Sequence, residues 1–403
     1  MNGQSRRGPE GTKRVFLHIG APKTGTTYLQ HVLFKNREAL AADGVLYPYS
    51  AVEQSFRSAH DFCGSPWFGH DAGRFRGEWA RIAELTRNWD GETVIISSEL
   101  LAAARPDRIR SRLDMLEPAE THVVFSARDL ARQLVSDWQE QVKHKHTVTL
   151  ERFVDDLVEL GHDAPEPFGR LFWGMHDAAF VLGCWVQVVP PERIHVITLP
   201  PPGGAADALW TRFCTVTGLD PQRYDTSARR SNTSMGVSET ELVRRMNSRL
   251  RRMDGNSYDV LVRLFLAEKV LGGGTTRLTL PPHRAAWAAE RSRTLIDELT
   301  AAGYRVEGDL EDLMPSPPDT AYVSPTALTD ADLGPVAIRA ASALLRQAGK
   351  LREQNRRLQA ALEGDPRSRA GRRVLERVVR AYRARRGSDS AGSSPQDATD
   401  GTP

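Results

Sequence analysis

The chain has 403 residues and is nearly balanced in charge, with 54 Lys and Arg against 51 Asp and Glu and a net charge of +3. This balance does not favour a nucleic-acid partner or bulk attraction to a membrane surface. No apolar run reaches the roughly 20 residues that a membrane-spanning helix needs. The three cysteines lack C-x-x-C spacing, so we expect buried thiols in a reducing, cytoplasmic compartment: Cys63, Cys184 and Cys214.

A polar leader, residues 1–13, precedes the first element, an apolar run over 15–19 that predicts a short buried strand. Gly20 and Pro22 break this strand, and a helix is predicted over 24–36. A strand, a glycine turn and a helix N-terminus form a phosphate cradle, because unpaired N–H groups and the helix dipole point at the anion. Lys23 adds a positive charge. Three hydroxyls add neutral donors: Thr24, Thr26 and Thr27.

The position of the lysine distinguishes this loop from an ATP- or GTP-binding loop. Gly20 and Gly25 have the spacing of G-x-x-x-x-G-K-[ST], but Thr26 occupies the lysine position and Lys23 lies inside the loop. The run from Pro22 to Thr27, Pro-Lys-Thr-Gly-Thr-Thr, closely resembles the 5′-phosphosulfate-binding loop of sulfotransferases that use 3′-phosphoadenosine 5′-phosphosulfate (PAPS). This resemblance implies that Lys23 and residues 25–27 hold the 5′-phosphate and the sulfuryl group.

An aromatic segment over 50–80 follows, which we predict to be irregular. It either lines an acceptor pocket or packs its rings onto the domain. No close-spaced His, Cys and Asp set in it fits a metal site, although it contains His60-Asp61 and His70-Asp71.

Strands and helices then alternate, which favours an α/β fold: a P-loop-like, three-layer αβα domain over 14–315 with a central, mostly parallel sheet. Further strands are predicted over 93–99, 122–128 and 193–199. Helices are predicted over 107–116, 130–143, 150–160, 171–188, 206–217, 257–271 and 284–302. Another helix begins near Ser238, which with Glu241 matches a capping box.

Two strands of this pattern end in a charged residue, Glu99 and Arg128, and side chains at such ends face the ligand crevice. The sulfotransferase resemblance, which covers about residues 14–240, gives both a role. A strand-end Arg with a Ser eight residues later binds the 3′-phosphate in that family, and Arg128 and Ser136 have this spacing. The family base is Glu or His; Glu99 is in the Glu position and His60 is the second candidate. The alternative for Glu99 is a structural carboxylate.

A basic link contains a third candidate cofactor contact, although it matches no strict motif. Its residues are Arg229, Arg230, Asn232 and Ser234. The scheme that the resemblance implies needs no metal.

The C-terminal part is predicted to be a linker over 316–335, a helical and basic extension over 336–386 and a disordered tail over 387–403. Heptads over 337–362 favour a short coiled coil that forms a dimer, or else a helix folded back on the domain. Leu344, Leu351 and Leu358 share one heptad position, and Ala348, Asn355 and Leu362 share its partner. Nine arginines fall within 367–386, as a solvated tail or a surface for acidic partners.

These observations favour transfer of a sulfuryl group from PAPS to an acceptor hydroxyl, with a carbohydrate or glycolipid as the preferred acceptor. Lys23 would neutralise charge on the departing oxygen. The first alternative is a P-loop kinase or nucleotide hydrolase that uses Glu99 or Asp129 as its metal-binding carboxylate. The second alternative is a non-catalytic scaffold that acts through its C-terminal helices.

Overall fold

The computed structural model describes residues 12–64, 73–205, 207–227, 234–274, 276–317 and 321–364, with side chains up to residue 360. The chain divides into two units, Met1–Ala337 and Ile338–Pro403. Four groups of predictions lie outside the described residues: most of the leader 1–13, His70-Asp71, the Arg229, Arg230 and Asn232 contacts, and everything beyond 364.

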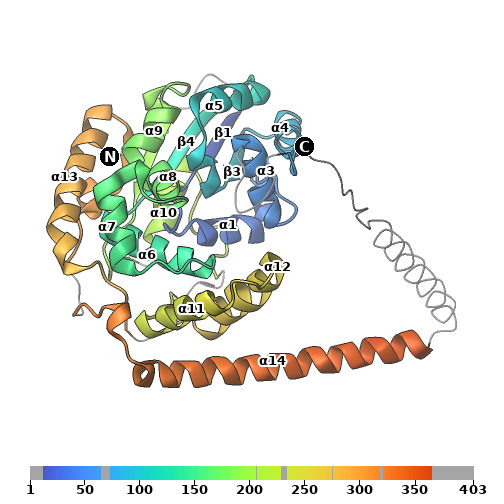
Figure 1. Ribbon diagram of the computed structural model, residues 1–403. Helices are drawn as coiled ribbons and strands as arrows, with labels where there is room; N and C mark the ends of the chain where they lie inside the picture. Colours follow the sequence, from blue (N-terminus) through green and yellow to red (C-terminus); the bar gives the residue numbers. More distant parts are fainter. Residues whose placement is uncertain are drawn as a thin grey trace, which may run out of the picture. The chain divides into compact units, whose positions relative to one another are not determined.

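The first unit contains a six-stranded parallel sheet with strand order β2-β3-β1-β4-β5-β6. Its strands are β1 (Arg14–His18), β2 (Val45–Leu46), β3 (Thr93–Ser97), β4 (Glu120–Ala127), β5 (Ile194–Thr198) and β6 (Arg305–Glu307). Helices flank the sheet (Figure 1). This arrangement confirms the predicted three-layer α/β fold. β6 was not predicted, because three residues at a sheet edge are too short to show a periodic pattern.

The central strands are apolar because helices cover the sheet, as is usual for parallel strands. In β1, Val15, Phe16 and Leu17 are at most 2% exposed. In β3, every residue is buried. The chain passes from β1 to β2 and β3 on one side and then crosses to β4 on the other, so the strand order reverses beside β1. Ligands of open α/β sheets bind at such a reversal, beyond the carboxyl ends of the strands.

The helices of the first unit mostly match the predicted ranges, with small differences at their ends. They are α1 (Thr26–Lys35), α2 (Arg37–Ala42), α3 (Glu53–Cys63), α4 (Glu78–Arg87), α5 (Pro106–Leu113), α6 (Leu130–Lys143), α7 (Leu150–Leu160), α8 (Phe168–His176), α9 (Ala178–Trp185), α10 (Ala208–Thr217), α11 (Val237–Arg249), α12 (Gly255–Tyr258) and α13 (Ala285–Ala302). The π-helix η5 (Asp259–Val270) continues α12.

Three local predictions were wrong. The segment 50–80 is not irregular throughout, because α3 buries one face, which includes Ala59 and Phe62. The helix predicted over 171–188 is two helices, since Asp177 caps α9 by accepting from the N–H groups of two residues that follow it. Ser238 does not cap α11, because Gly236 precedes the helix and Glu241 pairs with Arg244 and Arg245 instead.

The segment predicted as a linker, 316–335, makes specific contacts with the domain. The hydroxyls of Tyr322 and Ser324 both donate to Glu151 on α7. The last helix, α14, spans Asp330–Gly364 and includes the heptads. Helices with the length and apolarity to cross a bilayer are absent from the described residues.

Candidate functional site

The carboxyl ends of β3, β1 and β4 lie side by side and bring three distant segments together. His18 at the end of β1 is in register with Ser97 at the end of β3. The chain after β1 stays paired with β4, since Ala21 N donates to Ser126 O at 2.8 Å. The loop 19–25, Glu99 and Arg128 therefore meet at one edge of the sheet, as the sequence predicted.

The turn between β1 and α1 depends on residues with positive φ. Gly20 has a φ of 115° and Gly25 a φ of 86°, in the left-handed region that favours glycine. Lys23 also has a positive φ, 63°. Gly25 precedes α1 without a side-chain cap, so the first N–H groups of the helix face the loop, where an anion binds best.

The three threonines of the loop have different environments. Thr24 is fully buried and its hydroxyl donates to Ala21 O at 2.6 Å, so it stabilises the turn itself. Thr26 is buried at the start of α1, whereas Thr27 is partly exposed. Pro22 is also partly exposed, and its carbonyl accepts from Gln133 of α6 at 2.6 Å.

Lys23 points at α6. Its ammonium nitrogen lies 2.9 Å from Glu140 Oε2, and Lys143 contacts the same oxygen at 2.7 Å. Burial alone would lower the pKa of Lys23, but the Glu140 carboxylate raises it above the ordinary value. Burial alone would raise the pKa of Glu140, but Lys23 holds it well below the usual range. The two groups are therefore a charged pair.

Glu99 begins the 3-10 helix η1 (Glu99–Ala103), just beyond β3. Its carboxylate accepts a hydrogen bond of 2.8 Å from Gln30 of α1. Its backbone lies against the loop, since a Cβ added to Gly20 would be 3.3 Å from both Cα and Cβ of Glu99. Glu99 is thus held between the loop and α1, and it is only partly buried.

Arg128 connects the end of β4 with both the loop and α6. Its guanidinium donates to Lys23 O at 2.8 Å and to Ser136 Oγ at 2.6 Å, and also to the Arg132 carbonyl. These acceptors are all neutral. Burial lowers the pKa of Arg128 to about 10, and its Nε is buried without a hydrogen-bond partner. A partly buried cation with an unused donor is suited to an anionic ligand.

The second candidate base, His60, lies on α3 between the rings of Phe56 and Phe75 and is 1% exposed. Ser234, from the basic link, accepts at its carbonyl from Gly273 N at 3.1 Å. Within the described ranges, no group of three or more His, Cys, Asp or Glu side chains is arranged to hold a metal ion.

A polar stripe along α6 faces the loop, and most of it was not predicted from the sequence. Gln133 donates to the loop carbonyl of Pro22, Asp137 lies 3.4 Å from His176, and Glu140 pairs with Lys23. The signal was present, because polar residues recur every three or four positions on a helix that follows a central strand: Asp129, Gln133, Ser136, Asp137, Glu140 and His144.

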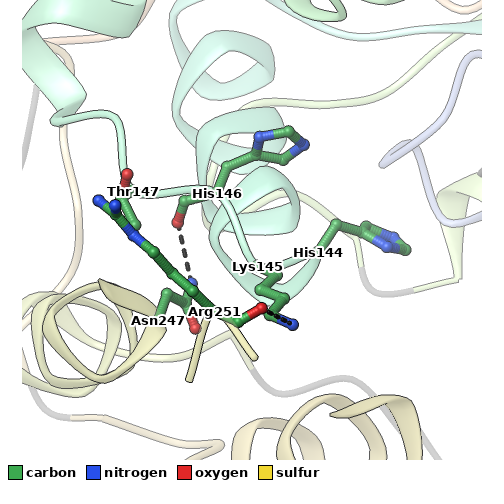
Figure 2. Close-up of a pocket in the computed structure, with 6 residues that line it drawn as sticks. All are labelled: His144, Lys145, His146, Thr147, Asn247 and Arg251. Carbon is green, nitrogen blue, oxygen red and sulfur yellow. Dashed lines mark hydrogen bonds between the residues drawn. The ribbon is translucent and has the colours of Figure 1, made fainter. Parts of the chain in front are cut away.

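A pocket of about 440 Å³ lies at the C-terminal end of α6 (Figure 2). It is lined by His144, Lys145, His146, Thr147, Asn247 and Arg251. Asn247 fixes one wall by donating to His146 O at 2.9 Å. His144 also lies 3.5 Å from Glu140, so the pocket is close to the ion pair of Lys23. No carboxylate lines the pocket.

Comparisons with known proteins give one structural similarity. No protein-family model matches the chain, and no curated protein matches it. A sulfotransferase of known structure from Alicyclobacillus acidocaldarius is 18% identical, and the alignment covers 60% of this chain and 97% of that one with a TM-score of 0.37. A similarity this distant does not support a conclusion about function. Any such conclusion must rest on the residues of the site.

Proposed function

We propose that the chain transfers a sulfuryl group from PAPS to an acceptor hydroxyl, with a sugar or glycolipid as the preferred acceptor. The observation that carries this proposal is the position of Arg128. It is a partly buried guanidinium bonded to Ser136 and to the loop carbonyl of Lys23, with neutral acceptors and a buried, unused Nε. The loop would bind the 5′-phosphosulfate, and Arg128 with Ser136 would bind the 3′-phosphate that distinguishes PAPS from ATP.

In this proposal the loop provides three kinds of donor. The first N–H groups of α1 and the hydroxyls of Thr26 and Thr27 would contact the phosphosulfate oxygens. Lys23 would stabilise the negative charge that develops on the oxygen leaving the sulfur. Most of the rate enhancement would come from positioning and electrostatics, as in phosphoryl transfer.

Glu99 is the proposed base that removes the proton of the acceptor hydroxyl. It lies against the loop at Gly20 and is partly exposed. Gln30 orients its carboxylate by donating to Oε2, which leaves Oε1 for the acceptor. A positioned carboxylate of this kind contributes about 10²- to 10⁴-fold to the rate of proton transfer.

The pocket beside His144 supports a polar, hydroxyl-rich acceptor. Its lining offers imidazole, hydroxyl and guanidinium groups, which can exchange hydrogen bonds with sugar hydroxyls, while the buried Asn247 amide is already bonded to Val142 O, His146 O and the Tyr258 hydroxyl. Metabolite extracts from cells with and without the gene identify the acceptor, because its product gains the mass of SO₃. Extracts that show no such product in either sample, while the purified protein binds no bisphosphate, contradict the proposal.

Binding of adenosine 3′,5′-bisphosphate tests the donor directly. We expect calorimetry to show binding of this nucleotide without a metal ion, and much weaker binding of adenosine 5′-phosphate, which lacks the 3′-phosphate. Magnesium-dependent binding of ATP with no affinity for the bisphosphate contradicts the proposal and favours the kinase or hydrolase alternative.

We further propose that α14 pairs with α14 of a second copy as a short parallel coiled coil. Leu351 is 47% exposed and Leu358 64% exposed along one stripe. Asn355 lies on that stripe, where it can bond to the same residue of a second chain and fix the register. At the positions that flank this stripe, Gln347 of one helix would lie opposite Arg352 of the other, so this pair brings no like charges together. The side chain of Leu362, in the last heptad, lies outside the described residues.

A further inference from the structure

One carboxylate lies among several basic groups beside the loop. Glu140 Oε2 lies 2.9 Å from the ammonium of Lys23 and 2.7 Å from that of Lys143. Its other oxygen, Oε1, lies 3.5 Å from His144 Nε2. The side chain of Glu140 is 24% exposed and that of Lys23 27%. Water therefore screens this cluster only partly, and the charges act strongly on one another.

The charges around Lys23 come from every element that packs against it. From α6 it faces Glu140, Asp137, Lys143 and His144, and from the end of β4 it faces Arg128. A second carboxylate, Glu268 of η5, is 4.0 Å from Lys143, beside Arg263. Glu140 is the carboxylate in direct contact with Lys23, so its removal leaves the lysine beside two other cations.

The titration of these groups agrees with the geometry. Burial lowers the pKa of Lys23 and Arg128 lowers it further, but Glu140, with a smaller contribution from Asp137, outweighs both and the pKa is raised. Burial lowers the pKa of Lys143, and so does the charge of Lys23. Without Glu140, Asp137 is the remaining carboxylate that favours the charged form of Lys23, against burial and Arg128, which favour loss of its proton.

We propose that Glu140 is a positioning residue for Lys23: it holds the ammonium group against α6 and preserves its positive charge within a cluster of basic side chains. Glu140 is not the base of the reaction, because a carboxylate whose pKa lies well below the usual range accepts a proton poorly. The importance of this role for catalysis rests on the proposed function. The charge of Lys23 itself can be measured without any ligand.

The first test follows the titration of lysine in the free, full-length protein by NMR of ¹³C-labelled lysine side chains. Lys23 is assigned from the signal that disappears in Lys23→Arg. We expect Glu140→Gln to lower the pKa of Lys23, and Glu140→Asp to lower it less. Lys143→Gln is the matched control, since it removes a cation and keeps the carboxylate, so the pKa of Lys23 should not fall. An unchanged Lys23 pKa in a folded Glu140→Gln protein overturns the proposal.

The second test measures the affinity for adenosine 3′,5′-bisphosphate between about pH 7 and pH 9, below the pKa of about 10 of Arg128. The wild type keeps Lys23 charged over most of this range, so its affinity changes little. In Glu140→Gln, affinity should fall as the pH rises through the lowered pKa, by up to about 10- to 100-fold. Lys23→Met/Glu140→Gln should lose this pH dependence. A Glu140→Gln profile parallel to that of the wild type overturns the proposal.

The two experiments distinguish the failure of this inference from the failure of the proposed function. If the wild type binds no bisphosphate, the proposed donor is wrong, but the lysine titration still decides whether Glu140 preserves the charge of Lys23. If the bisphosphate binds and the Lys23 pKa does not respond to Glu140, the donor site stands and the positioning role does not.

Discussion

The guanidinium of Arg128 donates a hydrogen bond of 2.6 Å to the hydroxyl of Ser136, eight residues further along the chain. The same guanidinium donates to Lys23 O at 2.8 Å, so one side chain joins β4, α6 and the loop after β1. A structural arginine in this position would normally be neutralised by a carboxylate. Arg128 is bonded instead to neutral oxygens, and Asp129, the carboxylate that acts on its charge, pairs with Arg132.

The first prediction concerns this charge. Arg128→Met should weaken the binding of adenosine 3′,5′-bisphosphate by about 10- to 100-fold, since it removes charge-assisted hydrogen bonds to a phosphate. Calorimetry measures the loss. Arg132→Met is the control, because Arg132 already pairs with Asp129 and bonds to Pro200 O. Equal losses in both variants would show damage to the N-terminus of α6 rather than a lost ligand contact.

The second prediction separates chemistry from binding at Glu99. Glu99→Gln should lower kcat by about 10²- to 10⁴-fold, because the amide cannot accept the acceptor proton. Its affinity for the bisphosphate should stay close to that of the wild type. The measurement is sulfuryl transfer to the acceptor found in the extracts, beside calorimetry of the same protein. A variant that retains full transfer removes Glu99 from the proposal, and His60 is then tested by His60→Gln.

The sequence predicted the parts of the site that lie within one strand, turn and helix. The loop residues, Glu99 and Arg128 all follow short, mostly apolar runs, and parallel strands bring their carboxyl ends to one edge. The pairing of Arg128 with Ser136 was readable only through the family resemblance, because Arg128 precedes α6 and no helix periodicity relates the two residues. The structure shows the hydrogen bond that this spacing allows.

The sequence did not predict which side chains contact these residues. Glu140 is 117 positions from Lys23 and Gln30 is 69 from Glu99, so only the packing of α6 and α1 against the sheet edge brings them together. The prediction of a capping box at Ser238 was wrong because the contacts of Glu241 could not be predicted either. Glu241 has two arginine partners in its own helix, and these outweigh a bond back to the helix start.

The third prediction tests the glycine turn of the loop. A Cβ on Gly25 would lie 2.5 Å from Leu209 Cδ2, at a φ of 86°. Gly25→Ala should therefore cost about 1–2 kcal/mol of unfolding free energy for the backbone strain, with a smaller addition for the shift of the Leu209 side chain, and should weaken bisphosphate binding. Gly44→Ala is the control, with a φ of 77° and no atom within 4 Å of the added Cβ. In chemical denaturation, Gly44→Ala should lose only the unfolding free energy that corresponds to the backbone strain. Equal costs would exclude a specific role for Leu209.

The fourth prediction concerns His18, which is buried beneath the loop between Ser97 and Ser126. Burial lowers its pKa to about 3, so the folded protein keeps it neutral while the unfolded chain takes up a proton below about pH 6.5. Its contribution to stability is therefore complete above about pH 6.5 and declines as the pH falls toward 3. At about pH 5 the loss should be about 2 kcal/mol.

Urea unfolding of the wild type and His18→Gln at about pH 7 and pH 5 measures this loss. The wild type should lose more stability than the variant between the two pH values, because glutamine does not titrate. Comparison within each protein cancels the contributions of other histidines, including His195. Equal losses in the two proteins mean that His18 titrates normally in the fold.

The fifth prediction tests the proposed pairing of α14. Leu351→Asp/Leu358→Asp places two carboxylates on the stripe and should convert a dimer to a monomer, since like charges would face one another across the seam. Sedimentation velocity of the full-length protein over a range of concentrations measures the change. Arg346→Asp, on the opposite face of α14, is the matched control and should leave the dimer intact. A wild type that is monomeric at every concentration contradicts the pairing.

Asn355→Leu tests whether Asn355 fixes the register. The variant should still associate, but as a mixture of oligomers instead of one dimer, because a polar residue at this position selects the dimer at a cost in stability.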